Sequence, residues 1–183
     1  MKNIDIKLKE NEIYKLKQLV GTKLVAFYHD PFVFTNTSSQ AVKIQTDTEN
    51  LYLYSFTEPY DYYGTEEDVA VWSVEDTEYP LISKKSFIDA PVNETVKKII
   101  IVNENQRLYE NNEMLYDVWL TRGIIFDFGN HQVSFEKAVW FSEDIIVRKG
   151  YELIKEFSPV SRFIDSDWEE GLVAECERTE IVL

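Results

Sequence analysis

Carboxylates and tyrosines are concentrated in one stretch of the chain, between Ile44 and Ser83. These forty residues contain ten aspartates and glutamates, no lysine or arginine, and six of the eleven tyrosines. Negative charge without a local counterion must face water, a cation or a basic surface. Tyrosine adds a large, rigid, amphipathic contact area at low entropic cost. The stretch therefore indicates an exposed surface that could contact a cationic partner.

A second acidic segment, Asp165 to Gly171, superficially resembles a calcium-binding loop. Counted from Asp165, the sixth position of an EF-hand loop should be glycine and the twelfth glutamate, but here they are Glu170 and Cys176. We therefore interpret the segment as a solvated turn and predict no metal site. A weak calcium site with oxygen ligands, here or at Glu66 to Asp68, stays an alternative that a calcium titration would test.

The residues that nucleophilic or zinc chemistry needs are scarce. His29 and His131 are the only histidines, and neither lies beside a serine or cysteine nucleophile in the sequence. His131 follows the turn residues Gly129 and Asn130, so we expect it to be exposed. Cys176 lies between Glu175 and Glu177, whose charges should raise its pKa, so we expect a buried structural thiol. We predict no catalytic residue, no cofactor and no enzymatic activity.

Length and composition favour one soluble, folded domain over residues 1–183. The chain is 44% hydrophobic and 14% aromatic, which is ample for a buried core. Its net charge of -14 repels nucleic-acid backbones and anionic membranes, while it attracts cationic partners. The simpler explanation, that the acidity only maintains solubility, has about equal weight. A lone cysteine excludes a disulfide scaffold, and no signal peptide or apolar span of membrane length is evident, so we expect a cytoplasmic protein.

Sequence periodicity predicts mainly β-structure. A short helix is expected over 12–20, capped by Asn11 and ended by Gly21, and a second over 149–157. Apolar or alternating runs predict strands at 23–28, 41–46, 51–56, 68–74, 96–103, 115–120, 124–128, 132–136 and 172–183. Turns are expected over 58–65, at Arg122 and Gly123, and at Gly129 and Asn130, where two residues fit a type II′ hairpin.

The expected fold is an antiparallel two-sheet sandwich or a partly open barrel with one or two short helices. A weak internal duplication, roughly 22–80 against 115–183, is suggested by two acidic turns that each precede a strand. We favour coincidence over duplication, because acidic turns before strands are common.

The leading hypothesis is a non-enzymatic acidic binding or inhibitor protein that docks a basic protein partner. The predicted partner-binding residues are Tyr60, Asp61, Tyr62, Tyr63, Glu66, Glu67, Asp68, Asp165, Asp167, Trp168, Glu169 and Glu170. The alternative is a small carbohydrate-binding or hydrolase-like domain, in which paired carboxylates and aromatic rings line a cleft. A deep cleft with two facing acids would favour that alternative. A third hypothesis is a homo-oligomer built through an apolar sheet face.

Overall fold

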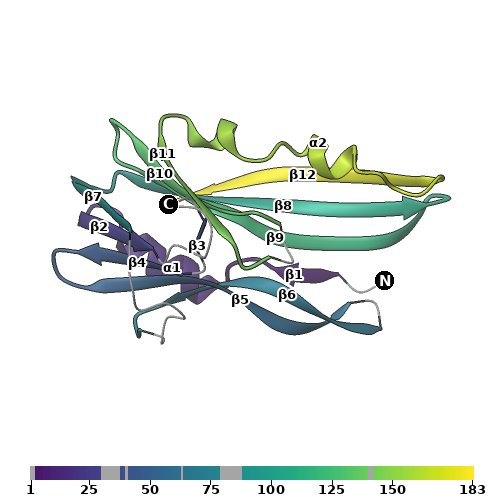
Figure 1. The fold of residues 1–183 in the computed structure, drawn as a ribbon, viewed down its shortest axis with the longest axis horizontal. Helices are drawn as coiled ribbons and strands as arrows, with labels where there is room; N and C mark the ends of the chain where they lie inside the picture. Colours follow the sequence, from purple (N-terminus) through teal and green to yellow (C-terminus); the bar gives the residue numbers. More distant parts are fainter. Residues whose placement is uncertain (1–2, 30–37, 40, 63, 79–87, 140–141) are drawn as a thin grey trace.

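Two β-sheets stack face to face and contain most of the regular structure. The computed structural model describes residues 3–29, 38–39, 41–62, 64–78, 88–139 and 142–183. Figure 1 shows the two layers along the long axis, with α1 at their side and α2 on the outer surface. The sheets of the described residues do not close into a barrel. The predicted mainly β, antiparallel two-sheet sandwich with short helices is confirmed.

The larger sheet has seven strands, with the order β12-β8-β9-β10-β11-β3 and with β1 paired to β9 off this path. They are β1 (Ile4–Ile6), β3 (Ser38–Ser39), β8 (Lys98–Glu110), β9 (Glu113–Asp127), β10 (Gln132–Lys137), β11 (Ile145–Gly150) and β12 (Leu172–Val182). The smaller sheet has the order β6-β5-β4-β2-β7. Its strands are β2 (Lys23–His29), β4 (Ala41–Thr46), β5 (Asn50–Tyr62), β6 (Thr65–Glu75) and β7 (Ile88–Thr95). The β1–β9 pair is parallel and the other pairs are antiparallel.

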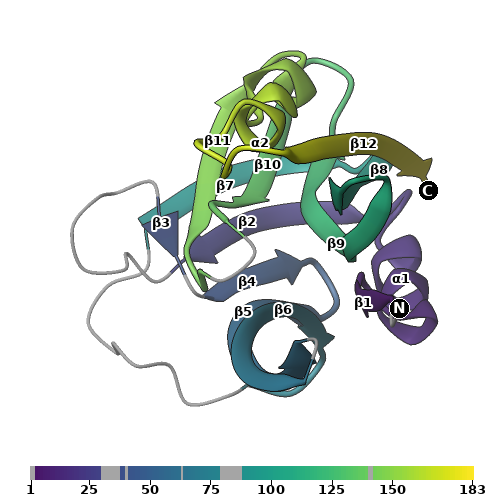
Figure 2. The ribbon, with the colours of Figure 1, turned by 90° about the vertical axis from the view of Figure 1, so that its right-hand side faces the viewer.

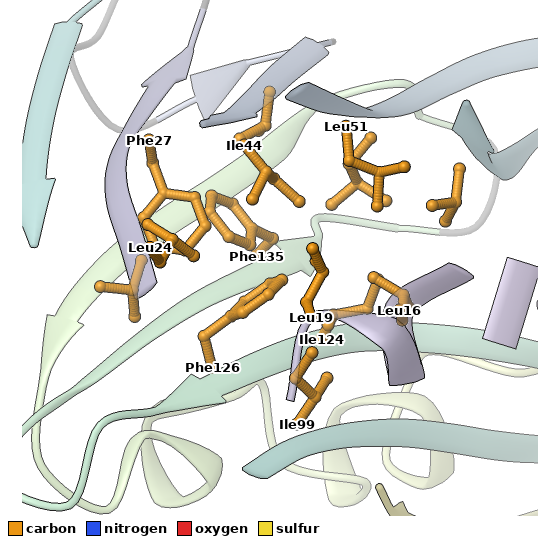
Figure 3. Close-up of a cluster of buried hydrophobic side chains, with 14 of the residues drawn as sticks. Leu16, Leu19, Leu24, Phe27, Ile44, Leu51, Ile99, Ile124, Phe126 and Phe135 are labelled. Atoms are coloured by element: carbon orange, nitrogen blue, oxygen red, sulfur yellow. The ribbon is translucent and has the colours of Figure 1, made fainter. Parts of the chain in front are cut away.

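The main core lies between the two sheets (Figure 3). Phe27 and Ile44 of the smaller sheet meet Ile124, Phe126 and Phe135 of the larger one, and all five side chains are fully buried. The Phe27 ring lies edge-on to the rings of Phe126 and Phe135, with centroids 5.0 and 5.1 Å apart. Such edge-on pairs add to the free energy that area burial already supplies.

Helix α1 (Glu10–Gln18) closes one side of the sandwich (Figure 2) and inserts Leu16 into the core. The prediction that Asn11 caps this helix is wrong, because α1 begins at Glu10. The Glu12 carboxylate accepts a 2.7 Å hydrogen bond from the backbone N–H of Lys9, which satisfies a donor at the helix start. The helix ends before Gly21, whose φ of +86° favours glycine.

The helix predicted over 149–157 is largely absent. Strand β11 continues to Gly150, and only one turn of 3₁₀-helix follows, η1 (Leu153–Glu156). Backbone pairing with β10 overrides the weak helical spacing, because Lys149 and Gly150 oppose Val133 and Gln132 in the ladder. A short helix, α2 (Ser161–Ile164), packs beside β12 (Figure 1).

The reversal predicted at Arg122 and Gly123 is also wrong, because both residues lie inside the single long strand β9. Val102 of β8 opposes Gly123, and Asn103 opposes Thr121, so Arg122 is the extra residue of a β-bulge. Gly123 is needed for a close approach: a Cβ there would overlap the Phe135 carbonyl oxygen and would lie 2.8 Å from the Phe157 ring. The arginine–glycine pair thus marks a bulge.

The turn expected at Gly129 and Asn130 lies where the sequence places it, between β9 and β10. The Phe128 N–H donates a 3.0 Å hydrogen bond to the His131 carbonyl, and Gly129 has a φ of +91°. A positive φ at the first central residue is the requirement of a type II′ turn, which explains the glycine.

Candidate functional site

The first predicted acidic segment forms the distal half of the β5–β6 hairpin. The sequence predicts a turn over 58–65, but the two strands pair as far as Tyr62 and Thr65. Strand β4 pairs with β5 only as far as Tyr54, so the hairpin continues beyond the edge of its sheet. Pro59, which lacks an N–H donor, is tolerated there because no described strand pairs with β5 on that side beyond Tyr54. The carboxylates therefore project on a paired ribbon.

Hairpin register gathers the carboxylates on one face of the ribbon. Asp61 lies directly opposite Glu66, and Asp68 follows Glu66 two residues along the same strand. Residues directly opposite or two apart share a face, so these three acids form one row. Glu66, Glu67 and Asp68 are exposed, while the Asp61 carboxylate accepts a 2.8 Å hydrogen bond from the Gly64 N–H.

The tyrosines do not all join this row. Tyr60 lies opposite Glu67 and is half-buried: it packs on the cluster around Ile4 and Val118, and its hydroxyl donates to the Asp5 carbonyl at 3.2 Å. Tyr60 therefore anchors the hairpin to β1. Tyr63 and the side chain of Tyr62 lie outside the described residues.

The second predicted segment is the exposed turn between α2 and β12. Asp165, Asp167, Glu169 and Glu170 are exposed, and Trp168 keeps 36% of its surface accessible. The Trp168 indole donates a 2.9 Å hydrogen bond to the Phe163 carbonyl, and the two rings meet edge-on at 5.2 Å. Trp168 is therefore oriented toward α2.

Within the described part of the chain, seven of the predicted carboxylates form no ion pair: Glu66, Glu67, Asp68, Asp165, Asp167, Glu169 and Glu170. Two lysines near the amino terminus are engaged elsewhere: Lys7 pairs with Asp5 at 3.2 Å and Lys15 with Glu75 at 3.1 Å. One acid of the 44–83 stretch, Glu75, is thus neutralised from the amino terminus, while Glu66, Glu67 and Asp68 form no ion pair with a described residue.

Both segments lie at one end of the molecule but in different layers. Figure 1 places the β5–β6 tip and the start of β12 at the same end of the long axis. Figure 2 looks along this axis and separates them, with the hairpin in the lower layer and the β12 turn in the upper one. The predicted site is therefore two acidic patches that share an end.

A buried ionic network in the larger sheet was missed by the sequence analysis. Glu136 is fully buried, and its carboxylate accepts hydrogen bonds from Arg122 Nε at 3.1 Å and from Arg148 Nη1 at 2.6 Å. Glu104 is 3% exposed, and it accepts a 2.5 Å hydrogen bond from Arg178 Nη2. The sequence signal for this network was the presence of charged residues within otherwise apolar strands. Such residues are buried with the strand, and buried charges must be paired.

A cavity of about 450 Å³ lies beside this network, between the larger sheet and the segment around α2. Its floor comes from β8 and from the bulged part of β9, through Glu104, Gln106 and Arg122. The aromatic rings of Tyr116, Phe163 and Trp168 contribute to its wall, so one predicted residue, Trp168, lines it.

The histidines and the cysteine form no catalytic constellation among the described residues. His131 is half-buried and stacks on Phe128 with centroids 5.0 Å apart, so the expectation of an exposed side chain is wrong. The His29 side chain lies outside the described part. Cys176 is half-buried, and burial, with the nearby Glu104 charge, raises its pKa to about 12. In the part described, no group of three or more histidine, cysteine or acidic residues could hold a metal ion.

Comparison of the chain with protein-family models, curated proteins and solved structures finds no match. Among the helices described, none has the length and apolarity to cross a membrane. Arguments about function therefore depend on the geometry of this chain alone.

Proposed function

We propose that this protein is a non-enzymatic acidic binding protein, and that it docks a basic protein partner through the distal β5–β6 hairpin. The supporting observation is the exposed row of carboxylates on this hairpin. Two of its members, Glu66 and Asp68, have no cationic partner among the described residues. The acidic turn before β12 lies at the same end and would extend the negative field. We place this activity in the cytoplasm, where a protein with a single cysteine needs no disulfide.

Electrostatic repulsion within the hairpin gives a physical reason for a cationic partner. Glu66 and Asp68 lie two residues apart on the same face of the ribbon, and like charges at such short range repel each other. A lysine- or arginine-rich surface would relieve the repulsion on docking, and the same carboxylates would steer it during the encounter. Tyr60 supports the hairpin from within and is not proposed as a contact residue.

The hydrolase-like alternative has less support from the cavity. A pair of catalytic carboxylates must face each other across a substrate, one of them free to take up a proton. Of the described residues that line the cavity, Glu104 is the one carboxylate, and it is hydrogen-bonded to Arg178. We therefore do not propose acid–base catalysis here.

The proposal is tested by affinity capture from an extract of the source cells at low ionic strength. The bait is the wild-type protein, compared with a triple variant, Glu66→Gln, Glu67→Gln and Asp68→Asn. We expect a basic protein that wild type recovers and the variant loses. A second variant, Asp165→Asn, Asp167→Asn and Glu169→Gln, removes the same number of charges from the β12 turn and should retain part of the binding. If wild type and the hairpin variant recover the same proteins, the proposal is wrong.

A further inference from the structure

The cavity under α2 combines cationic groups with an apolar wall, and neither is explained by partner docking at the hairpin. We propose that it is a binding site for a small organic carboxylate with an aromatic or aliphatic body. Its volume of about 450 Å³ lies within the roughly 300–1,000 Å³ range of small-molecule sites. The proposal is independent of the proposed function, because the cavity lies between α2 and the larger sheet.

Arg122 supplies a fixed guanidinium at the cavity. The bulge in β9 makes it the extra residue of the strand, and bulges commonly redirect a side chain next to a functional site. Its Nε donates to Glu136 at 3.1 Å and its Nη2 to the Ala138 carbonyl at 3.2 Å. No described residue accepts a hydrogen bond from Nη1. A side chain that is held at two nitrogens can offer the third to a ligand with little loss of entropy.

Arg162 supplies a second cation, from α2. It lines the cavity, and its guanidinium forms no ion pair or hydrogen bond with any described residue, while its backbone carbonyl accepts a 2.7 Å hydrogen bond from the Ser166 hydroxyl. Glu104, on the cavity floor, is held by Arg178 at 2.5 Å, so its charge is already compensated. Two guanidiniums with spare donors therefore face a space that contains no uncompensated carboxylate from the described residues.

Local charge differs in sign from the whole molecule. The buried network has three arginines (Arg122, Arg148 and Arg178) and two glutamates (Glu104 and Glu136), so it has one excess positive charge. The net charge of the whole chain is -14. A monoanionic carboxylate would neutralise this excess, and its planar oxygens match the guanidinium fork. A large polyanion would meet the negative field of the rest of the surface.

The apolar part of the cavity lining selects the body of the ligand. Tyr116 and Phe163 stack with centroids 6.1 Å apart, and Phe163 meets Trp168 at 5.2 Å. Leu108, Pro159 and Val160 add apolar surface beside these rings. Apolar lining with a few fixed polar groups is the usual composition of a small-molecule site. Inorganic anions would leave this wall unused.

The test is calorimetric titration of the full chain with phenylacetate, indole-3-acetate and octanoate. The neutral amide of each acid and inorganic phosphate are the comparison ligands. We expect at least one carboxylate to bind with a Kd below about 1 mM, and its amide to bind at least about tenfold more weakly. The proposal is overturned if none of the three carboxylates binds, if the amides bind equally well, or if phosphate binds more tightly.

Two variants localise the binding without disturbing the buried network. Arg162→Gln removes the exposed cation, and we expect it to weaken carboxylate binding by about tenfold. Val139→Trp places an indole at a lining position that is 44% exposed, and it should block binding. Arg107→Gln is the matched control, because Arg107 pairs with Glu175 and does not line the cavity. Equal affinity in all three variants would place any binding elsewhere and refute the site.

Discussion

Buried charges are the most informative single residues of this protein. Glu136 is fully buried and accepts hydrogen bonds from two arginines and from the Ser158 N–H at 2.9 Å. It therefore joins β9, β10, β11 and the segment before α2 through one carboxylate. The sequence shows this residue in an alternating strand, but alternation does not reveal which partners arrive from distant strands.

Replacement of Glu136 by glutamine should strongly destabilise the protein. Glutamine keeps the shape of the side chain but removes the negative charge that Arg122 and Arg148 need. Loss of one partner from a buried ion pair costs about 3–5 kcal/mol. Urea unfolding should show this loss, whereas Glu169→Gln, on the exposed turn, should change the free energy of unfolding by less than about 0.5 kcal/mol. A near-neutral effect of Glu136→Gln would mean that the network is not closed in solution.

Lys137 should make stability depend on pH. It is 1% exposed, its Nζ donates to the Ala70 carbonyl, and no described carboxylate pairs with it. Burial, with the nearby Arg122 charge, lowers its pKa from 10.5 to about 7. Below the folded pKa both states are protonated, and the native state bears the full cost of the buried charge. Between the two values the native state releases its proton while the unfolded chain keeps it, so stability rises with pH.

The measurement for Lys137 is urea unfolding from about pH 7 to about pH 10, compared with Lys137→Met. As the pH rises, the free energy of unfolding of the wild type should increase relative to that of the variant by up to about 1.4 kcal/mol per pH unit. Lys17→Met, on the surface of α1, is the control and should leave the wild-type slope unchanged. A difference between wild type and Lys137→Met that does not vary with pH would contradict the lowered pKa.

At the scale of elements, regular patterns were predicted well and irregular ones were not. Strand β4 has the predicted bounds, and β12 matches within one residue, because the burial of their side chains alternates over most of each strand. Strand β9 was divided in two, because a bulge at Arg122 shifts the alternation as a turn would. Local sequence cannot distinguish these cases, since the bulge depends on pairing with β8.

The same limit applies to the candidate site. The unpaired acids of the hairpin could be predicted, because no lysine or arginine occurs near them in the sequence. The inward position of Tyr60 could not be predicted, because its partner Asp5 is far away along the chain. The cavity could not be predicted either, because it forms where α2, β8 and β9 come together, and no spacing in the sequence indicates those contacts.

The bulge of β9 gives a prediction for Gly123. Alanine there would place a methyl group against the Phe135 carbonyl and the Phe157 ring, both closer than normal contact distance. Such overpacking costs about 1–3 kcal/mol, which should appear as a lower midpoint of thermal or urea unfolding. Gly150→Ala is the matched control, because its nearest atom is the end of the Leu153 side chain at 3.3 Å and should move aside. Equal losses in the two variants would contradict the close-approach argument.

At the scale of the whole molecule, charge is divided between two environments. Most of the described lysines and arginines with ion pairs hold acids of the sandwich or of the buried network. Among the described residues, the acids left without such partners include Glu66 and Asp68 of the β5–β6 tip and Glu169 and Glu170 of the β12 turn, which lie at one end of the molecule. A negative field concentrated at one end steers a cationic partner, and added salt screens it.

The most direct test is the association rate constant of the captured basic partner, measured by stopped flow from about 25 to about 300 mM NaCl. For the wild type we predict a decrease of at least about tenfold over this range, because exposed carboxylates steer the encounter. The variant with Glu66→Gln, Glu67→Gln and Asp68→Asn should associate slowly at every salt concentration. An association rate constant that does not change with salt concentration, or one that is the same in wild type and variant, would contradict docking at the acidic hairpin.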